Sequence, residues 1–192
     1  AQVAMFYQQR DDIQIKQSLV QSRVDSNAVS FTDYFGNSAE GSNYGVELEF
    51  NWLANESLAL FGTVGLLETE YDIPLSADLN RRDQAHAPGY QFALGGTAQV
   101  TDSLTVSIDV EGKDKFYLSS RHGEQSESYE LLNASLDYNL GDWELSLWGR
   151  NLTDEQVIVR GFGGFGNDPR KFYVTEPYYQ FGEPRMFGVS GK

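Results

Sequence analysis

Cationic side chains gather in two polar stretches of the sequence, and these groups are the best suited to bind an anion. Arg81, Arg82 and His86 lie in the first stretch, and Arg121 and His122 lie in the second. Guanidinium groups pair well with carboxylates, so the functional interpretation of both clusters is capture of an anionic small molecule. The competing interpretation is solvated loop charge balanced by nearby carboxylates, because exposed loops are polar in any case.

A third candidate is a glycine-rich stretch further along the chain. It combines the cations Arg160 and Arg170 with the rings of Phe162 and Phe165 and the amide of Asn167. Glycines let an exposed loop fold tightly, and aromatic faces together with cations suit ligand capture. We therefore expect a ligand-binding loop here, with inward packing of the two rings on neighbouring strands as the structural alternative.

The same stretch matches G-x-G-x-x-G from Gly161 to Gly166. A dinucleotide-binding fingerprint needs a helix directly after these glycines, so that the helix N-terminus can hold the pyrophosphate. Here Asn167, Asp168 and Pro169 follow instead. We therefore interpret the glycines as part of a loop and expect no nucleotide cofactor.

The remaining composition gives little support to catalysis, a metal site or nucleic-acid binding. The chain has no cysteine and two histidines, and no convincing pair of nucleophile and base. Asp72, Asp78 and Asp83 do not have the spacing of a calcium loop. The formal net charge of -14 disfavours nucleic acid, whose phosphates require a basic face. We expect no enzyme, no metal and no resident cofactor.

Alternating apolar and polar residues predict the elements that must position these loops. In one segment Leu104, Val106 and Ile108 alternate with Thr105 and Ser107. The same period of two recurs along most of the chain, which indicates β-strands with one apolar and one polar face. On this basis Val106, Leu136 and Leu147 should share the apolar face, and Glu111, Asp137 and Glu144 the polar face.

The connections between the strands alternate in length. Eight strands are expected, at residues 3–20, 31–53, 57–71, 89–101, 103–118, 128–140, 142–152 and 178–191. Tight turns join some of them at Asn55-Glu56, Thr101-Ser103 and Gly141-Asp142, whereas long polar loops join the others. Short turns at one end and long loops at the other are typical of a transmembrane β-barrel, and aromatic residues near the strand ends fit its interfacial girdles.

The motifs resemble one known family. The segments at residues 43–50, 148–154 and 182–189, together with 6–15, resemble the C-terminal barrel strands of TonB-dependent outer-membrane receptors. The resemblance implies an all-β, antiparallel transmembrane β-barrel of about 22 strands, of which residues 1–192 would supply about the last eight. Both ends of the chain fall inside expected strands, so we expect a barrel segment without its plug domain.

The resemblance also implies a function and a location. Such receptors lie in the bacterial outer membrane, contact lipid and lipopolysaccharide, and import scarce nutrients with energy passed through TonB to the plug. A ferric siderophore or similar iron complex is the expected ligand, and the wall strands and late extracellular loops are the expected contribution of this chain. The lumen-facing Glu47, Glu49, Asp109, Glu111 and Asp137 could contact the plug.

Two other functions fit parts of the pattern. A soluble β-sandwich that binds carbohydrate would place the apolar faces in a core and stack Trp and Tyr on sugar rings. A β-rich enzyme could use a pair of carboxylates such as Asp109 and Glu111, although residues two apart on any strand share a face.

Overall fold

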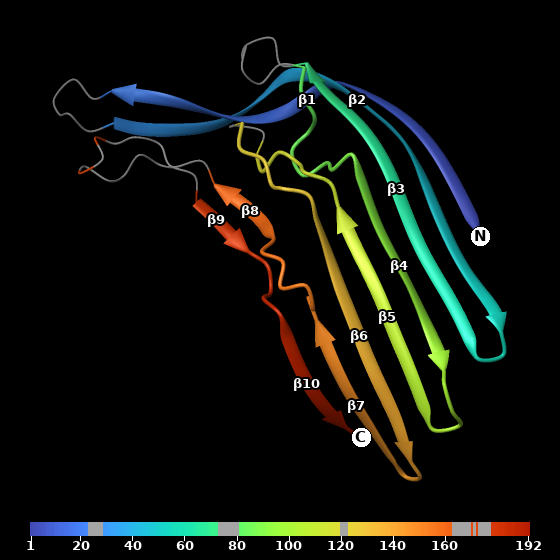
Figure 1. Cartoon of the computed structure of the whole chain (residues 1–192). Helices are drawn as coiled ribbons and strands as arrows, with labels where there is room; N and C mark the ends of the chain where they lie inside the picture. Colours follow the sequence, from blue (N-terminus) through green and yellow to red (C-terminus); the bar gives the residue numbers. More distant parts are fainter. Residues whose placement is uncertain (23–28, 73–80, 120–122, 163–169, 171, 173–177) are drawn as a thin grey trace.

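One curved, open antiparallel sheet makes up most of the protein (Figure 1). The computed structural model describes residues 1–22, 29–72, 81–119, 123–162, 170, 172 and 178–192. Its strands are β1 (Gln2–Ser22), β2 (Val29–Asn55), β3 (Leu58–Asp72), β4 (Tyr90–Gln99), β5 (Leu104–Lys113), β6 (Tyr129–Leu140), β7 (Trp143–Arg150), β8 (Ile158–Phe162), β9 (Tyr178–Phe181) and β10 (Met186–Gly191). Among these described residues, no helix is long and apolar enough to cross a membrane.

The sheet order is β1-β2-β3-β4-β5-β6-β7-β10, and β8 pairs with β9 as a separate ribbon. Neighbouring strands are antiparallel throughout. Seven of the expected strands are confirmed with small shifts of their ends, and β5 ends at Lys113 instead of Leu118. The last contact with β4 is made by Asp114 N–H, which donates to the carbonyl of Tyr90, and beyond it Phe116 and Leu118 bond to Ser126 and Glu124 within the connection itself.

The expected last strand, residues 178–191, is wrong as a single element. It is divided into β9 and β10, which belong to different sheets, and β8 lies inside an expected loop. Gly182 and Pro184 interrupt the run, and Pro184 has no N–H to donate to a ladder. The fingerprint-like Gly161 and Phe162 lie in β8, in an antiparallel ribbon, and residues 163–166 fall outside the described part of the chain.

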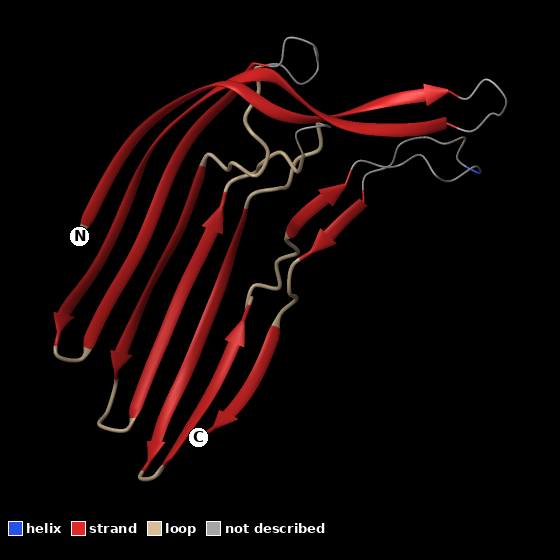
Figure 2. Cartoon of the chain, turned by 180° about the vertical axis from the view of Figure 1, so that it is seen from behind, coloured by secondary structure: helices blue, strands red, loops and turns tan. Residues whose placement is uncertain are grey.

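The three tight turns are confirmed, and their side chains explain them. Asn55 Oδ1 accepts a hydrogen bond from Ser57 N–H at 2.8 Å, and Thr101 Oγ1 accepts one from Leu104 N–H at 3.0 Å. Gly141 adopts a φ of 66°, which glycine tolerates without steric cost. These turns fall at one end of the sheet and the long connections at the other, as Figure 2 shows.

The pairing register confirms the two faces. Directly paired residues in antiparallel strands project to the same side. One row across the sheet is apolar: Ala98, Val106, Leu136, Leu147 and Val189. The next row is polar: Gln99, Thr105, Asp137, Ser146 and Ser190.

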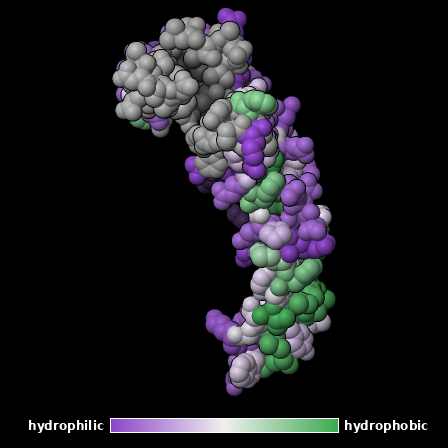
Figure 3. All heavy atoms as spheres, turned by 90° about the vertical axis from the view of Figure 1, so that its left-hand side faces the viewer, coloured by the Kyte–Doolittle hydropathy of each residue, from purple (hydrophilic) through white to green (hydrophobic). Residues whose placement is uncertain are grey.

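The apolar face of the sheet has no second layer against it in the described residues. Leu147 is 52% exposed and Val189 is 74% exposed. In the view of Figure 3, hydrophobic residues gather toward the lower end of the molecule and hydrophilic residues prevail above them. Such an uncovered apolar band suits lipid, whereas a sandwich would bury it against a second sheet.

The buried hydrophobic side chains lie instead among the long connections. Phe116, Leu118 and Val157 are the buried hydrophobic side chains of the described chain. The long β1–β2 ribbon bends at the same end, where register shifts flank Ile13 and Asp12 has a φ of 53°. A bulge of this kind redirects a strand pair, and Figure 1 shows the outer part of the ribbon turned across the top of the sheet.

Candidate ligand-binding rim

Of the three candidate clusters, the first is fully described and lies at the loop end of the sheet, the third is described in part, and the second lies outside the described residues. The first cluster precedes β4, where Tyr71 and Arg82 form an isolated antiparallel bridge. Arg121 and His122 of the second cluster, and Phe165 and Asn167 of the third, lie outside the described residues. Arg170 is described and exposed.

Arg82 is buried, with 9% of its surface exposed. Its Nη2 donates to the carbonyl of Ser119 at 2.8 Å, and its guanidinium lies 4.4 Å from the centre of the Tyr117 ring. Burial lowers the pKa of Arg82 from its ordinary value, while Tyr117 and Tyr71 oppose this shift. The guanidinium therefore braces the connection after β3 against the connection after β5.

Arg81 and His86 are exposed neighbours of this brace. Both have positive φ, 52° for Arg81 and 59° for His86, so the chain turns sharply at each of them. The N–H of His86 donates to the carbonyl of Tyr117 at 2.9 Å, and its ring centre lies 5.5 Å from that of Phe116. The side chains of Arg81 and His86 thus project from a connection whose backbone is held in place by hydrogen bonds.

The connection after β5 folds on itself to form a small core. Ser126 is buried, its N–H donates to the carbonyl of Phe116, and its Oγ accepts from Phe116 N–H at 3.0 Å. Leu118, only 2% exposed, donates its N–H to the carbonyl of Glu124 at 2.9 Å. The amphipathic Lys113 lies with its Nζ 6.0 Å from the centre of the Phe116 ring.

The β8–β9 ribbon packs on this core. A Cβ on Gly161 would lie 2.5 Å from Leu118 Cδ1, so the ribbon approaches as closely as only glycine permits. Tyr179 donates its hydroxyl proton to Glu124 Oε2 at 2.9 Å, and this bond raises the pKa of Tyr179. Arg160 is exposed on the ribbon. Phe162 is the last residue of β8, and the described part of the structure does not include its side chain.

The described segments at residues 81–89, 114–119 and 123–127 and the β8–β9 ribbon thus form one braced unit, which we call the loop cap. Tyr117, Glu124 and Tyr179 also belong to the loop cap. Nothing in the local sequence pattern marks them as members, because each contact joins residues far apart in the chain.

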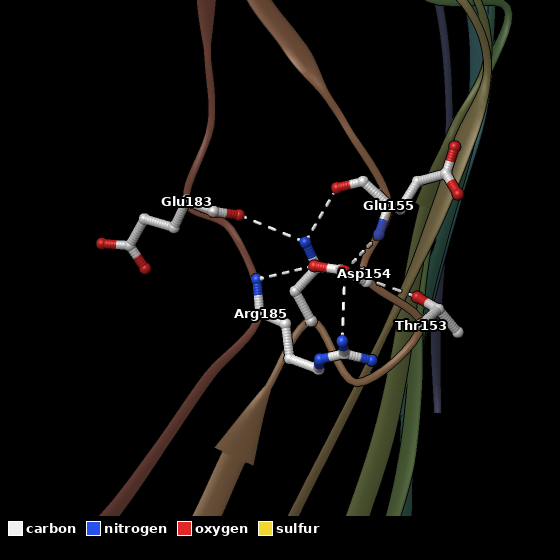
Figure 4. A network of polar contacts seen from close by, with 6 residues as sticks. Thr153, Asp154, Glu155, Glu183 and Arg185 are labelled. Atoms are coloured by element: carbon white, nitrogen blue, oxygen red, sulfur yellow. Dashed lines mark hydrogen bonds and ion pairs between the residues drawn. The ribbon is translucent and has the colours of Figure 1, made fainter.

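A second polar network lies where β7 ends and β10 begins (Figure 4). Asn151 is buried at 3% exposure and bonds to residues before and after the β8–β9 ribbon. Asp154 forms an ion pair with Arg185 at 3.2 Å, and both side chains are about half exposed. In the sequence these residues are recognisable only as part of the segments that resemble the receptor family.

The polar face of the sheet carries a hollow of about 670 Å³. Among its lining residues are Glu47, Glu49, Gln91, Glu111 and Lys113. Three carboxylates against one ammonium make this part of the wall acidic. No group of three or more acidic or histidine side chains that could hold a metal ion occurs among the residues the structure describes.

Comparisons with known proteins agree with this architecture. Residues 1–152 match the family model described as TonB dependent receptor-like, beta-barrel. The chain is similar to the ferric yersiniabactin uptake receptor FyuA from Yersinia pestis, with a TM-score of 0.76 and 16% identity over 98% of this chain and 26% of that chain. It is also similar to the siderophore receptor PiuA from Acinetobacter baumannii, with a TM-score of 0.74 and 18% identity over 98% of this chain and 25% of that chain.

A third similar structure is the ferric-catecholate import receptor Fiu from E. coli K12, with a TM-score of 0.66 and 16% identity over 98% of this chain and 24% of that chain. The chain spans about a quarter of the length of these receptors. The carbohydrate-binding sandwich finds no support, and the matched family is one of transport receptors, not enzymes. The expected resemblance is confirmed: this chain belongs to the β-barrel family of TonB-dependent receptors, which are proteins of the bacterial outer membrane.

Proposed function

We propose that this chain forms late wall strands and extracellular loops of a receptor that imports a ferric siderophore or similar iron complex. The observation that carries the proposal is the braced loop cap, which presents exposed cations at one end of a barrel wall. Three structurally similar proteins are receptors for iron chelates or siderophores by name, which supports this ligand class.

The exposed cations Arg81, Arg160 and Arg170, with His86, are the described candidates for contact with an anionic chelate. Arg121, His122, Phe162, Phe165 and Asn167 remain candidates from the sequence. Arg82 differs from them because it is buried, with its guanidinium against Tyr117 and Ser119. Its expected contribution to ligand binding is to hold Arg81 and His86 in place.

The acidic hollow supports a second part of the proposal, contact with the receptor's own plug domain. Glu47, Glu49 and Glu111 line it together, so a cationic side chain of the plug would meet several carboxylates. Energy from the TonB complex would reach the ligand through that plug. This chain would supply the wall against which the plug moves.

The opposite face would meet lipid and, further from the tight turns, lipopolysaccharide. Tyr44 lies beyond the apolar residues Val46 and Leu48 of the same face and donates its hydroxyl proton to Glu68. A tyrosine paired with a glutamate at this distance from the tight turns suits the polar boundary of the membrane.

Uptake of radiolabelled ferric chelates by cells that carry a complete receptor with this wall tests the proposal. Loss of one charge-assisted hydrogen bond typically weakens binding by about tenfold to hundredfold. We therefore expect Arg81→Ala and Arg160→Ala to raise the concentration needed for half-maximal uptake by at least about tenfold when combined.

Lys192→Ala is the matched control, because Lys192 is an exposed cation near the tight turns, where its backbone bonds to Glu144. It should leave uptake unchanged. Transport of a different nutrient class by the unmodified receptor would refute the iron assignment. Unchanged uptake of the chelate by the double variant would refute the role of these two arginines.

A further inference from the structure

The pairing of β10 with β7 needs a device that fixes its register. A tight turn sets the register of β6 on β7, because only two residues, Gly141 and Asp142, connect them. Residues 151–185 separate β7 from β10, so no turn constrains that pair. The alternation of faces is no safeguard against a shift of two residues, which returns every side chain to its own face.

Asn151 joins the two ends of this long connection. Its Nδ2 donates to the carbonyl of Glu155 at 2.8 Å and to the carbonyl of Glu183 at 3.2 Å. Glu155 lies on the way into the β8–β9 ribbon, and Glu183 lies on the way out of it. One amide group therefore holds the departing and returning chains together, directly above the first pair of β10, Met186 with Arg150.

The remaining bonds of Asn151 tie this point to the wall. Its Oδ1 accepts from Glu155 N–H at 2.9 Å, and its own N–H donates to Asn133 Oδ1 on β6 at 3.1 Å. The backbone has a φ of 48°, a left-handed conformation that asparagine tolerates better than most residues. The side chain is buried, its Nδ2 donates and its Oδ1 accepts, so a residue other than asparagine would leave some of these partners without a hydrogen bond.

Asp154 and Arg185 repeat the connection on the exposed side. Arg185 Nη2 lies 3.2 Å from Asp154 Oδ2, and Arg185 N–H donates to Asp154 Oδ1 at 3.4 Å (Figure 4). An exposed ion pair of this kind contributes little by itself. Its position matters more than its strength, because it again joins the departing chain to the residue just before β10.

The strands carry an independent mark of the same register. Trp148 lies across its partner Gly188, where a Cβ would come within 2.1 Å of the indole. Trp148 Nε1 also donates to Ser190 Oγ at 3.2 Å. A shift by two residues would place Met186 or Ser190 beneath the indole instead of glycine.

We propose that Asn151, with the Asp154–Arg185 pair, forms a rim clamp that sets the register of β10 on β7 and closes the root of the β8–β9 ribbon. The clamp acts on strand pairing and does not depend on which ligand the receptor carries. The residues of the clamp position β10 against β7, and removing them should shift the pairing register of these two strands.

Cysteine cross-linking reads this register directly, because these 192 residues contain no native cysteine; any cysteine elsewhere in the complete receptor is first replaced by serine. Glu144 and Lys192 exchange both backbone hydrogen bonds, so Leu147 and Val189 form a pair without them. Side chains approach most closely in such pairs, which suits a disulfide. Leu147→Cys with Val189→Cys reports the native register, and Leu147→Cys with Phe187→Cys or Gly191→Cys reports a shift by two residues.

The complete receptor is refolded from urea into detergent micelles, oxidised and mapped by mass spectrometry of the linked peptides. In the receptor with no substitution at Asn151, we expect the yield of the cross-link between positions 147 and 189 to exceed that of either shifted cross-link by at least tenfold. Asn151→Asp keeps the shape of the side chain but replaces the donor with an oxygen facing two carbonyl groups. We expect this variant to raise the yield of shifted pairs by at least tenfold relative to the native pair.

Asn151→Gly is the second variant, because it tolerates the backbone conformation and introduces no charge. It should shift the pairing in the same direction. Asn139→Asp is the matched control on β6, where the side chain is exposed, and it should retain the native pair. Native pairing in both Asn151 variants would overturn the clamp, whatever ligand the receptor transports.

Discussion

Replacing Leu147 with arginine should destabilise the barrel far more than the same change at its neighbour Ser146. Leu147 lies in the apolar row of the sheet, and Ser146 lies in the adjacent polar row. Both are on β7, one residue apart, so local strand propensity and distance from the chain ends are matched. The comparison therefore isolates the environment of each face.

The expected size follows from the depth of Leu147. β7 begins at Trp143, beside the tight turn, and Leu147 follows four residues later. At about 3.4 Å per residue and a tilt of about 40°, Leu147 lies about 10 Å into a band that is about 25 Å tall. This is close to the midplane, where a lipid-facing arginine costs about 2 to 4 kcal/mol of folding free energy.

Reversible unfolding of the complete receptor in lipid vesicles measures this difference, with heat-modifiable gel migration to report the folded fraction. We expect Leu147→Arg to lose about 2 to 4 kcal/mol and Ser146→Arg less than about 1 kcal/mol. Leu147→Ala controls for lost side-chain volume. Equal losses for the two arginine variants would refute the assignment of the faces.

Three further predictions concern the loop end and the last strand. Gly188→Val should cost about 1 to 3 kcal/mol by overpacking against Trp148, and unfolding measurements should show the loss largely removed in a Trp148→Ala background. Leu118→Ala should cost the loop cap about 2 to 5 kcal/mol of local stability, read as faster proteolysis within residues 113–127, with the exposed Val189→Ala as control. Tyr179→Phe should remove one phenol that titrates above its ordinary pKa, because Glu124 stabilises the protonated form. The Tyr179–Glu124 contact should therefore be intact below about pH 10 and lost as the pH rises through the raised pKa, as ultraviolet difference titration against the variant would show.

The wall of the barrel could be predicted because its information is local. A period of two assigns each residue to a face, and short turns with suitable side chains join the strands. The pairings of Ala98 with Val106 and of Leu136 with Leu147, each across a tight turn, follow from these two features alone. Even in the long strand β2, apolar and polar residues alternate along the part that would cross the membrane.

The division between β9 and β10 could not be predicted in the same way. Residues 178–181 and 186–191 both alternate acceptably, and Gly182 and Pro184 are tolerated at bulges and edges of strands. Where the run breaks, the backbone bonds to residues far earlier in the chain: Gly182 N–H donates to the carbonyl of Val157, and the carbonyl of Glu183 accepts from Asn151. Local pattern contains no record of such a contact.

Arg82 shows the same limit for the candidate site. Its neighbours in sequence are polar or charged, and the pattern therefore predicts an exposed loop cation. Burial results from Tyr117 and Ser119, which come from the next long connection. The sequence correctly identifies where charge is concentrated, whereas the contacts decide which charges face outward and which brace the loops.

The two ends of the sheet therefore depend on different physical chemistry. In the wall, the apolar side chains face outward, so burial in a protein core cannot select one strand register over another shifted by two residues. Short turns make that selection where they exist. At the loop end, where connections are long, buried polar groups such as Asn151 and Arg82 take over, because each demands specific partners and leaves an unpaired polar group if the register changes. In this family member, the polar contacts at the rim thus supply the specificity that a hydrophobic core supplies in a water-soluble domain.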